Sequence, residues 1–223
     1  MEFDSGQFAD FVLKNGVIAF KEDLITYKSG RRGHCYVNWR VAINDAYLLD
    51  QVTDSIIDFV NSKKLAPRSF YGVPEGATKL GVLTQYKWAK SRPNYAPGIY
   101  VLPMGRAVPK DHGAPEDKFF VGMPQGNTIV LEDTTTTGGS LLQSIDSLQA
   151  SGVKIIAAIA LTNRNEVRDD GLTVPQALEK KGVPYYALSN LKDLLPSVYD
   201  ALKPSPEIRQ AVDAYFEKYG AKN

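Results

Sequence analysis

The sequence predicts an α/β protein in which a central parallel sheet is flanked by helices. The first observation is the stretch 129–140, where an apolar run leads into a polar turn and then into apolar residues at helical spacing. A second apolar run, 153–161, follows directly, and a strand, a helix and a strand in this order place the two strands in parallel. The second observation is a further apolar run, Gly/Pro turn and helical pattern at 69–90. A helical pattern at 174–181 and an apolar run at 183–188 continue the alternation.

The remaining elements are expected from local patterns. A helical pattern beginning at Phe8 ends at Gly16, and an alternating strand after it delivers Lys28 and Arg31 into a Ser-Gly turn. We expect further strands at 36–40, 99–103 and 119–123, and further helices at 45–61, 190–195 and 206–219. The segment 104–118 is polar and contains Pro and Gly, which predicts a mobile loop of the kind that acts as a lid. A basic turn or a charged loop can also be plain solvated surface, and that alternative stays open.

The composition excludes several classes of protein. A chain of 223 residues suits one α/β domain with a small addition or two small domains, and 43% hydrophobic residues supply a core. The net charge of +1 gives no electrostatic footprint for nucleic acid or a membrane surface. No apolar run is long enough to span a bilayer, and the first residues lack the apolar segment of a signal peptide. One cysteine, Cys35, excludes an internal disulfide, and His34 and His112 are too few for a histidine-built zinc site. We therefore expect a cytoplasmic protein.

The turn after the apolar run 129–131 has the chemistry of a phosphate site. A strand-to-helix turn points backbone N–H groups and the positive end of the helix dipole at one spot, and Gly138 and Gly139 let the backbone approach a ligand. No lysine follows the glycines, so this is not the phosphate loop of nucleotide hydrolases. Glu132 and Asp133 cannot favour a phosphate, and sugar hydroxyls or a bound magnesium ion are their natural partners. A plain loop with polar caps is the alternative.

The order of apolar run, paired acids, threonines and Gly-Gly-Ser resembles the motif with which type I phosphoribosyltransferases bind 5-phosphoribosyl-1-diphosphate (PRPP). Other segments resemble the orotate phosphoribosyltransferases of that family: Tyr27 to Arg31, Arg106 to Gly113, Arg164 with its neighbours, and Ala214 to Gly220. The resemblance implies the type I phosphoribosyltransferase fold, with an N-terminal hood at 1–40, a core at 41–223 and a mobile lid loop at about 104–118. It also implies a magnesium-dependent pentosyltransferase that converts PRPP and orotate into orotidine 5′-monophosphate and diphosphate in UMP biosynthesis.

The resemblance assigns roles to individual residues. The residues implied in catalysis are Arg106, Lys110, His112 and Asp133. Those implied in PRPP binding are Glu132, Asp133, Thr134, Thr135, Thr136, Thr137, Gly138, Gly139 and Ser140, with Arg106, Lys110 and His112. Those implied in orotate binding are Lys28, Thr136 and Arg164. Mg²⁺ is expected to arrive with PRPP and to need no dedicated protein ligand. A homodimer is implied, in which the lid loop crosses to the partner's site; neither nucleic acid nor membrane is an expected partner.

The sequence also departs from this family at positions that bear on function. Ala107 stands where the lid loop usually carries a second lysine, and Asn163 replaces an aspartate before Arg164. The turn 72–77 lacks a lysine that some members carry near the diphosphate. These departures leave the preferred base open. The alternatives are a type I enzyme acting on a purine or on uracil, and a regulator that senses PRPP without catalysis.

Overall fold

The computed structural model describes residues 2–108, 110–111 and 118–222. Its elements are, in chain order, α1 (Ser5–Lys14), β1 (Ile18–Thr26), β2 (Arg32–Val37), α2 (Arg40–Ile43), α3 (Ala46–Ser62), β3 (Ser69–Gly72), α4 (Thr78–Lys90), β4 (Thr128–Thr135), α6 (Gly139–Ala150), β5 (Ile155–Asn163), α7 (Val174–Glu179), β6 (Tyr185–Asn190), α8 (Leu191–Leu202) and α9 (Pro206–Tyr219). Within this described part of the chain, no helix is long and apolar enough to cross a membrane.

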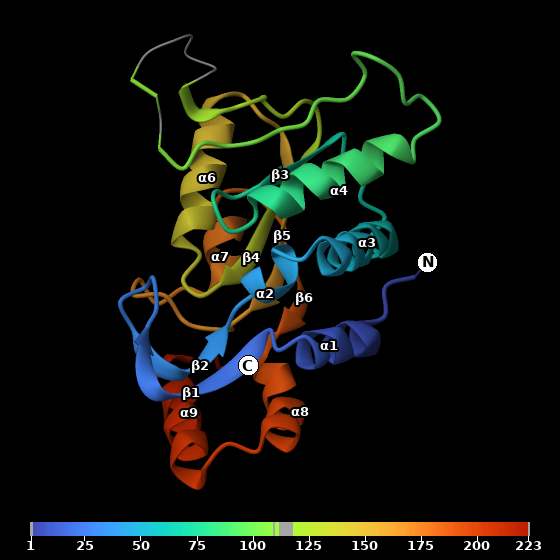
Figure 1. The fold of residues 1–223 in the computed structure, drawn as a ribbon. Helices are drawn as coiled ribbons and strands as arrows, with labels where there is room; N and C mark the ends of the chain where they lie inside the picture. Colours follow the sequence, from blue (N-terminus) through green and yellow to red (C-terminus); the bar gives the residue numbers. More distant parts are fainter. Residues whose placement is uncertain (1, 109, 112–117, 223) are drawn as a thin grey trace.

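The predicted parallel sheet is confirmed. Its four strands lie in the order β3-β4-β5-β6, and Leu131 at the centre pairs with Gly72 on one side and Ile159 on the other. Side chains alternate between the two faces of the sheet, because successive strand residues point in opposite directions. Leu131 packs into a core with α1, α3, α4 and α8, whereas Val130 packs into a second core with α6 and α7. Helices therefore cover both faces (Figure 1), and the carboxyl ends of the strands are left as the edge where a ligand can bind.

The N-terminal hairpin forms a separate antiparallel sheet of β1 and β2. It packs against the C-terminal helices α8 and α9 (Figure 1). Helix α1 ends before Gly16, whose φ of 63° is the left-handed conformation that glycine adopts most readily. The turn between β1 and β2 carries Lys28 toward α6, as its contact with Ser140 shows. The division of the chain into a hood at 1–40 and a core at 41–223 remains a prediction.

Three predicted strands are wrong in whole or in part. Residues 99–103 form no strand, and 119–123 make only a single bridge, between Gly105 and Phe120. Their apolar residues have the right propensity, but no strand in the described part of the chain lies alongside to supply a ladder. The strand predicted at 36–40 ends at Val37, because Trp39 takes up helical backbone angles and begins α2. The Trp39 indole N–H donates to the Thr162 hydroxyl on β5, which ties this helix to the sheet.

Two elements are longer than predicted. Helix α8 continues past Pro196 to Leu202, because Leu194, Leu195, Val198 and Tyr199 maintain a buried face that outweighs the cost of an interior proline. Strand β4 extends to Thr135, two residues beyond the paired acids, which the sequence predicted at the end of this strand. This extension fixes Glu132 and Asp133 on the rigid sheet.

Candidate functional site

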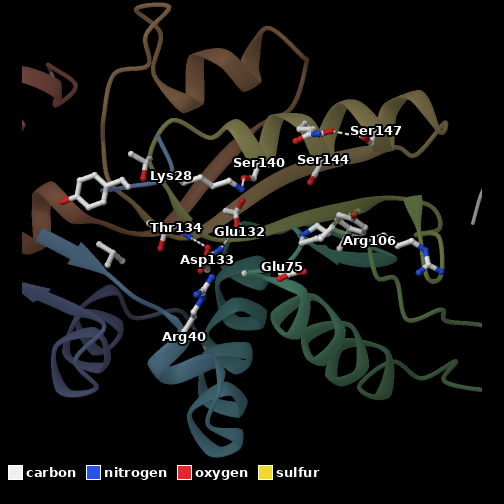
Figure 2. Close-up of a pocket in the computed structure, with 18 of the residues that line it drawn as sticks. Lys28, Arg40, Glu75, Arg106, Glu132, Asp133, Thr134, Ser140, Ser144 and Ser147 are labelled. Atoms are coloured by element: carbon white, nitrogen blue, oxygen red, sulfur yellow. Dashed lines mark hydrogen bonds between the residues drawn. The ribbon is translucent and has the colours of Figure 1, made fainter. Parts of the chain in front are cut away.

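A cavity of about 640 Å³ lies at the carboxyl ends of β3, β4 and β5. Walls come from the hairpin, from α2, from the β3–α4 loop and from the first turns of α6 (Figure 2). Eight of the predicted site residues line it: Lys28, Arg106, Glu132, Asp133, Thr134, Thr136, Ser140 and Arg164. Residues that are more than a hundred positions apart in the sequence thus meet at one edge of the sheet.

A second cavity of about 360 Å³ is formed by the turn between β4 and α6, and it shares Glu132, Thr134 and Ser140 with the first. Gly138 has a φ of 68°, and a Cβ atom there would come within 3.1 Å of Val174. Helix α6 begins with no side-chain cap at Gly138, so its first backbone N–H groups are open to a ligand. The Lys28 Nζ atom donates to the Ser140 hydroxyl at 2.6 Å and brings a positive charge to the same place. This arrangement suits a phosphate group.

The paired acids occupy different environments. Glu132 is 7% exposed, and burial, together with the neighbouring negative charge of Asp133, raises its pKa well above the usual value. Asp133 is half-buried and accepts a hydrogen bond from the Thr134 N–H at 2.7 Å. A Cβ atom at Gly76 would lie 3.0 Å from the Asp133 carboxylate, so the β3–α4 loop passes directly over this side chain. Figure 2 shows the Arg40 side chain reaching toward Asp133 from α2.

Arg164 is held from several sides at the end of β5. Its Nε atom donates to Glu166 at 2.7 Å and its Nη1 atom to the Cys35 carbonyl at 3.0 Å, while its guanidinium lies 4.3 Å from the centre of the Tyr27 ring. Burial would lower the pKa of Arg164, but the Glu166 carboxylate outweighs burial and raises it. Its Nη2 atom is buried with no hydrogen-bond partner in the described part of the chain. A buried cation in a cavity wall, with one nitrogen left unpaired, is suited to a carboxylate.

Unpaired polar atoms recur in these walls. Thr134 lines the larger cavity and Ser29 the smaller one, and the hydroxyl oxygens of both are buried without a hydrogen-bond partner in the described part of the chain. Buried polar atoms without partners are costly and scarce in folded proteins. Their concentration here indicates polar ligand groups that complete the hydrogen bonding.

Proteins of known function resemble the chain in sequence and in fold, although no family model matches it. The orotate phosphoribosyltransferase of Bradyrhizobium diazoefficiens is 28% identical over 193 residues, 79% of this chain and 90% of that protein. The one of Methylococcus capsulatus is 26% identical over 217 residues, 96% of each chain.

Solved structures of other proteins share the fold of this chain. The orotate phosphoribosyltransferase of Francisella tularensis superposes with a TM-score of 0.69 at 20% identity, over 96% of this chain and 100% of that one. The UMP synthase of Leishmania donovani gives a TM-score of 0.72 at 16% identity, over 96% of this chain and 42% of that one. The fold is that of a type I phosphoribosyltransferase. The fold class predicted from the sequence is confirmed, and so is the resemblance to orotate phosphoribosyltransferases.

The other predicted site residues differ in whether they line a cavity of this type I fold. Thr137 and Gly139 line the smaller cavity with Gly138. Thr135 lines neither cavity, because its hydroxyl points into the sheet toward Tyr185 and Asn163. Lys110 is outside both cavity walls, and its backbone N–H donates to the Lys118 carbonyl. His112 falls outside the described residues, as does most of the predicted lid loop beyond it. The roles given to Lys110 and His112 remain predictions.

Arg31 has a structural position. It lies in the predicted turn between β1 and β2, where its guanidinium forms ion pairs with Glu166 and Asp169, at 3.0 and 2.8 Å. Its guanidinium also lies 4.6 Å from the centre of the Tyr219 ring on α9. Arg31 therefore anchors the hairpin turn that carries Lys28, and it does not line the larger cavity.

Sequence reasoning missed several residues of the cavity wall. Arg40 lines it from α2 and belongs to no recognisable motif, and Glu75 lines it from the β3–α4 loop, where the turn 72–77 was compared with the family but Glu75 was given no role. Ser144 and Ser147 line it from α6. These two serines could have been found, because they follow Ser140 at spacings of four and seven and so share its helix face.

Proposed function

We propose that the chain is an orotate phosphoribosyltransferase, which joins the phosphoribosyl group of PRPP to orotate and releases diphosphate in UMP biosynthesis. One observation carries the proposal: two adjoining cavities, which share Glu132, Thr134 and Ser140, bring together an acid pair, a helix-terminal phosphate turn and a buried arginine with an unpaired nitrogen. The relatives' names support the choice of reaction.

PRPP occupies the β4–α6 side of the cavity in this proposal. Its 5′-phosphate lies in the turn 136–140, where the N–H groups of α6 and the Lys28 ammonium meet it. Its ribose hydroxyls meet Glu132 and Asp133. A carboxylate accepts hydrogen bonds from hydroxyls, and the raised pKa of Glu132 lets that side chain donate as well.

Orotate lies between the hairpin and the end of β5. Its carboxylate meets the unused Nη2 atom of Arg164, and Lys28 and Thr136 meet the ring oxygens. This placement puts the base on the far side of the acid pair from the β3–α4 loop. The diphosphate then extends toward that loop, where Arg40 and Arg106 also line the cavity.

During the reaction, positive charge develops on the ribose as its bond to diphosphate breaks. The pyrimidine nitrogen bonds to C1 of the ribose and loses its proton, while the bond from C1 to diphosphate breaks and diphosphate takes the electron pair. Asp133 offsets the charge that develops on the ribose, and Arg106, Lys110 and His112 offset the charge on diphosphate. Holding both substrates in line supplies much of the acceleration.

We also propose that Mg²⁺ enters with PRPP. Glu132 and Asp133 offer oxygen atoms, the donor type that this ion prefers. Among the described residues, no group of three or more His, Cys, Asp or Glu side chains is arranged to hold a metal. When bound, the ion neutralises part of the diphosphate charge. A homodimer with crossing lid loops and a cytoplasmic location complete the proposal. Val41 on α2 and Tyr47 at the start of α3, exposed at 42% and 72%, support a protein contact there.

Orotate consumption, followed by its ultraviolet absorbance with PRPP and Mg²⁺, tests this function. We expect loss of orotate only when PRPP is present, no loss with a chelator, and a strongly reduced rate for Lys110→Ala. Lys118→Ala, a nearby lysine outside both cavities, is the matched control. If PRPP binds but orotate is untouched, the substrate assignment is wrong, and uracil and purine bases are tested next. If no base reacts, a PRPP-sensing regulator becomes the better reading.

A further inference from the structure

Glu166 is a buried carboxylate that joins three separate parts of the chain. Its side chain is 0% exposed. One oxygen, Oε1, accepts from Arg164 Nε at 2.7 Å, and the other, Oε2, accepts from Arg31 Nη1 at 3.0 Å and from the Tyr215 hydroxyl at 2.8 Å. These partners come from the end of β5, from the hairpin turn and from α9. Glu166 itself lines neither cavity, so it has no direct route to a ligand.

The contacts of Glu166 determine which part of Arg164 remains available. A guanidinium has three nitrogens; here Nε is taken by Glu166 and Nη1 by the Cys35 carbonyl. The aromatic rings of Tyr27, Tyr215 and Phe216 lie 4.3, 5.8 and 5.9 Å from its central carbon. Only Nη2 is left, buried and without a partner in the described part of the chain. The side chain therefore cannot turn its two-nitrogen fork toward the cavity without breaking a buried ion pair.

We propose that Glu166 is a positioning residue that fixes Arg164 so that a single nitrogen, Nη2, meets the carboxylate of the base end-on. The proposal rests on the proposed function and deepens it, because it assigns base selection to a residue that does not touch the base. A base without a carboxylate, such as uracil, leaves Nη2 unpaired and is bound less well. Without the Glu166 charge, the guanidinium can rotate, and both the affinity for orotate and the discrimination against uracil fall.

The test is the variant Glu166→Gln, which keeps the side-chain size and removes the charge. We expect the KM for orotate to rise about tenfold or more and the orotate-to-uracil preference to fall by a similar factor, while the KM for PRPP changes less than twofold. Tyr215→Phe removes one of the hydrogen bonds to the carboxylate and should shift the orotate KM in the same direction by about twofold. Asp54→Asn, which disrupts an ion pair with Lys87 far from the cavity, is the control for loss of a carboxylate.

A purely structural role for Glu166 gives a different pattern. In that case Glu166→Gln would lower the melting temperature and raise the KM values for PRPP and orotate together, and this result overturns the proposal. An unchanged orotate KM overturns it as well. If Glu166→Gln does not fold, Tyr215→Phe decides, and an unaltered orotate KM in that variant is the overturning result. Failure of the proposed function is separate, because the wild-type protein would then use no orotate at all.

Discussion

The Nζ atom of Lys28 lies 2.6 Å from the Oγ atom of Ser140, and the two residues are 112 positions apart. The contact joins the turn of the N-terminal hairpin to the first turn of α6. Lys28 lines both cavities, so the proposed phosphate and base sites share one cation. The first prediction follows from this sharing.

Replacement of Lys28 should weaken the binding of both substrates. For Lys28→Ala we expect the KM values for PRPP and for orotate each to rise about tenfold, because a charge-assisted hydrogen bond contributes on the order of 1.5–3 kcal/mol. Lys28→Arg should recover part of the loss. Lys21→Ala, in the exposed part of β1, is the control. A change confined to one substrate would contradict the shared position.

Arg40 is predicted to bind the diphosphate side of PRPP. It lines the cavity together with Glu75 and Asp133. Because these two carboxylates repel the diphosphate of PRPP, a nearby cation is needed to bind it. Arg40→Ala should raise the KM for PRPP several-fold and weaken inhibition by diphosphate, with the orotate KM nearly unchanged. Arg32→Ala, an exposed arginine on β2, should have no effect. Equal affinity for diphosphate in wild type and Arg40→Ala would show that Arg40 does not bind the diphosphate.

Adding Glu75→Gln to Arg40→Ala extends the same test. The double variant lacks one negative charge beside the diphosphate, so part of the lost PRPP affinity should return. Steady-state kinetics of the four proteins form a cycle that reports coupling between the two positions. Purely additive effects would mean that Arg40 and Glu75 act on different parts of the ligand.

Glu132→Gln should stabilise the protein at neutral pH while it impairs PRPP binding. The folded-state pKa of Glu132 is raised, so the folded protein holds this proton more tightly than the unfolded chain does. As pH rises from the ordinary glutamate pKa, about 4.3, toward the raised value, ionisation costs the folded state stability. The variant has no such cost. Its melting temperature should match wild type near pH 4 and exceed it at pH 7, by about 2–4 °C per kcal/mol.

The pH dependence is what makes the Glu132 prediction specific. A gain in melting temperature that is equal at pH 4 and pH 7 would come from packing and would count against the buried charge. Asp133→Asn serves as a comparison, since Asp133 is more exposed.

Gly138→Ala should disturb the phosphate turn. Alanine at a φ of 68° costs about 1–2 kcal/mol, and its Cβ atom would press on Val174 at 3.1 Å. We expect a lower melting temperature and a PRPP KM raised more than the orotate KM. For stability, Gly139→Ala is the matched control, because nothing lies within 4 Å of a Cβ atom there. Equal melting temperatures for the two variants would refute this reasoning.

Local patterns predicted the site better than they predicted its surroundings. The phosphate turn and the paired acids could be predicted because a strand, polar turn and helix are contiguous in sequence. Lys28 and Arg164 entered through a resemblance, and the structure places both in the cavity wall. The strand expected at 99–103 failed because pairing depends on a neighbour that no local pattern reveals.

Glu166 and Arg40 show a second limit of sequence reasoning. Glu166 matters through partners 135 and 49 positions away, and only the folded chain brings them together. Arg40 begins a short helix, although the sequence predicted it as the last residue of a strand at 36–40. Side chains whose importance comes from tertiary contacts leave no trace in spacing.

The three-way junction at Glu166 has a consequence for how the protein folds. The hairpin turn, the end of β5 and α9 must all be in place before Arg164 is oriented, and their sequence separations make this a late, non-local event. The sheet and its helices can be assembled while the base site is still unformed. During refolding, circular dichroism should therefore recover ahead of orotate turnover, and enzymatic activity is the more stringent measure of complete folding.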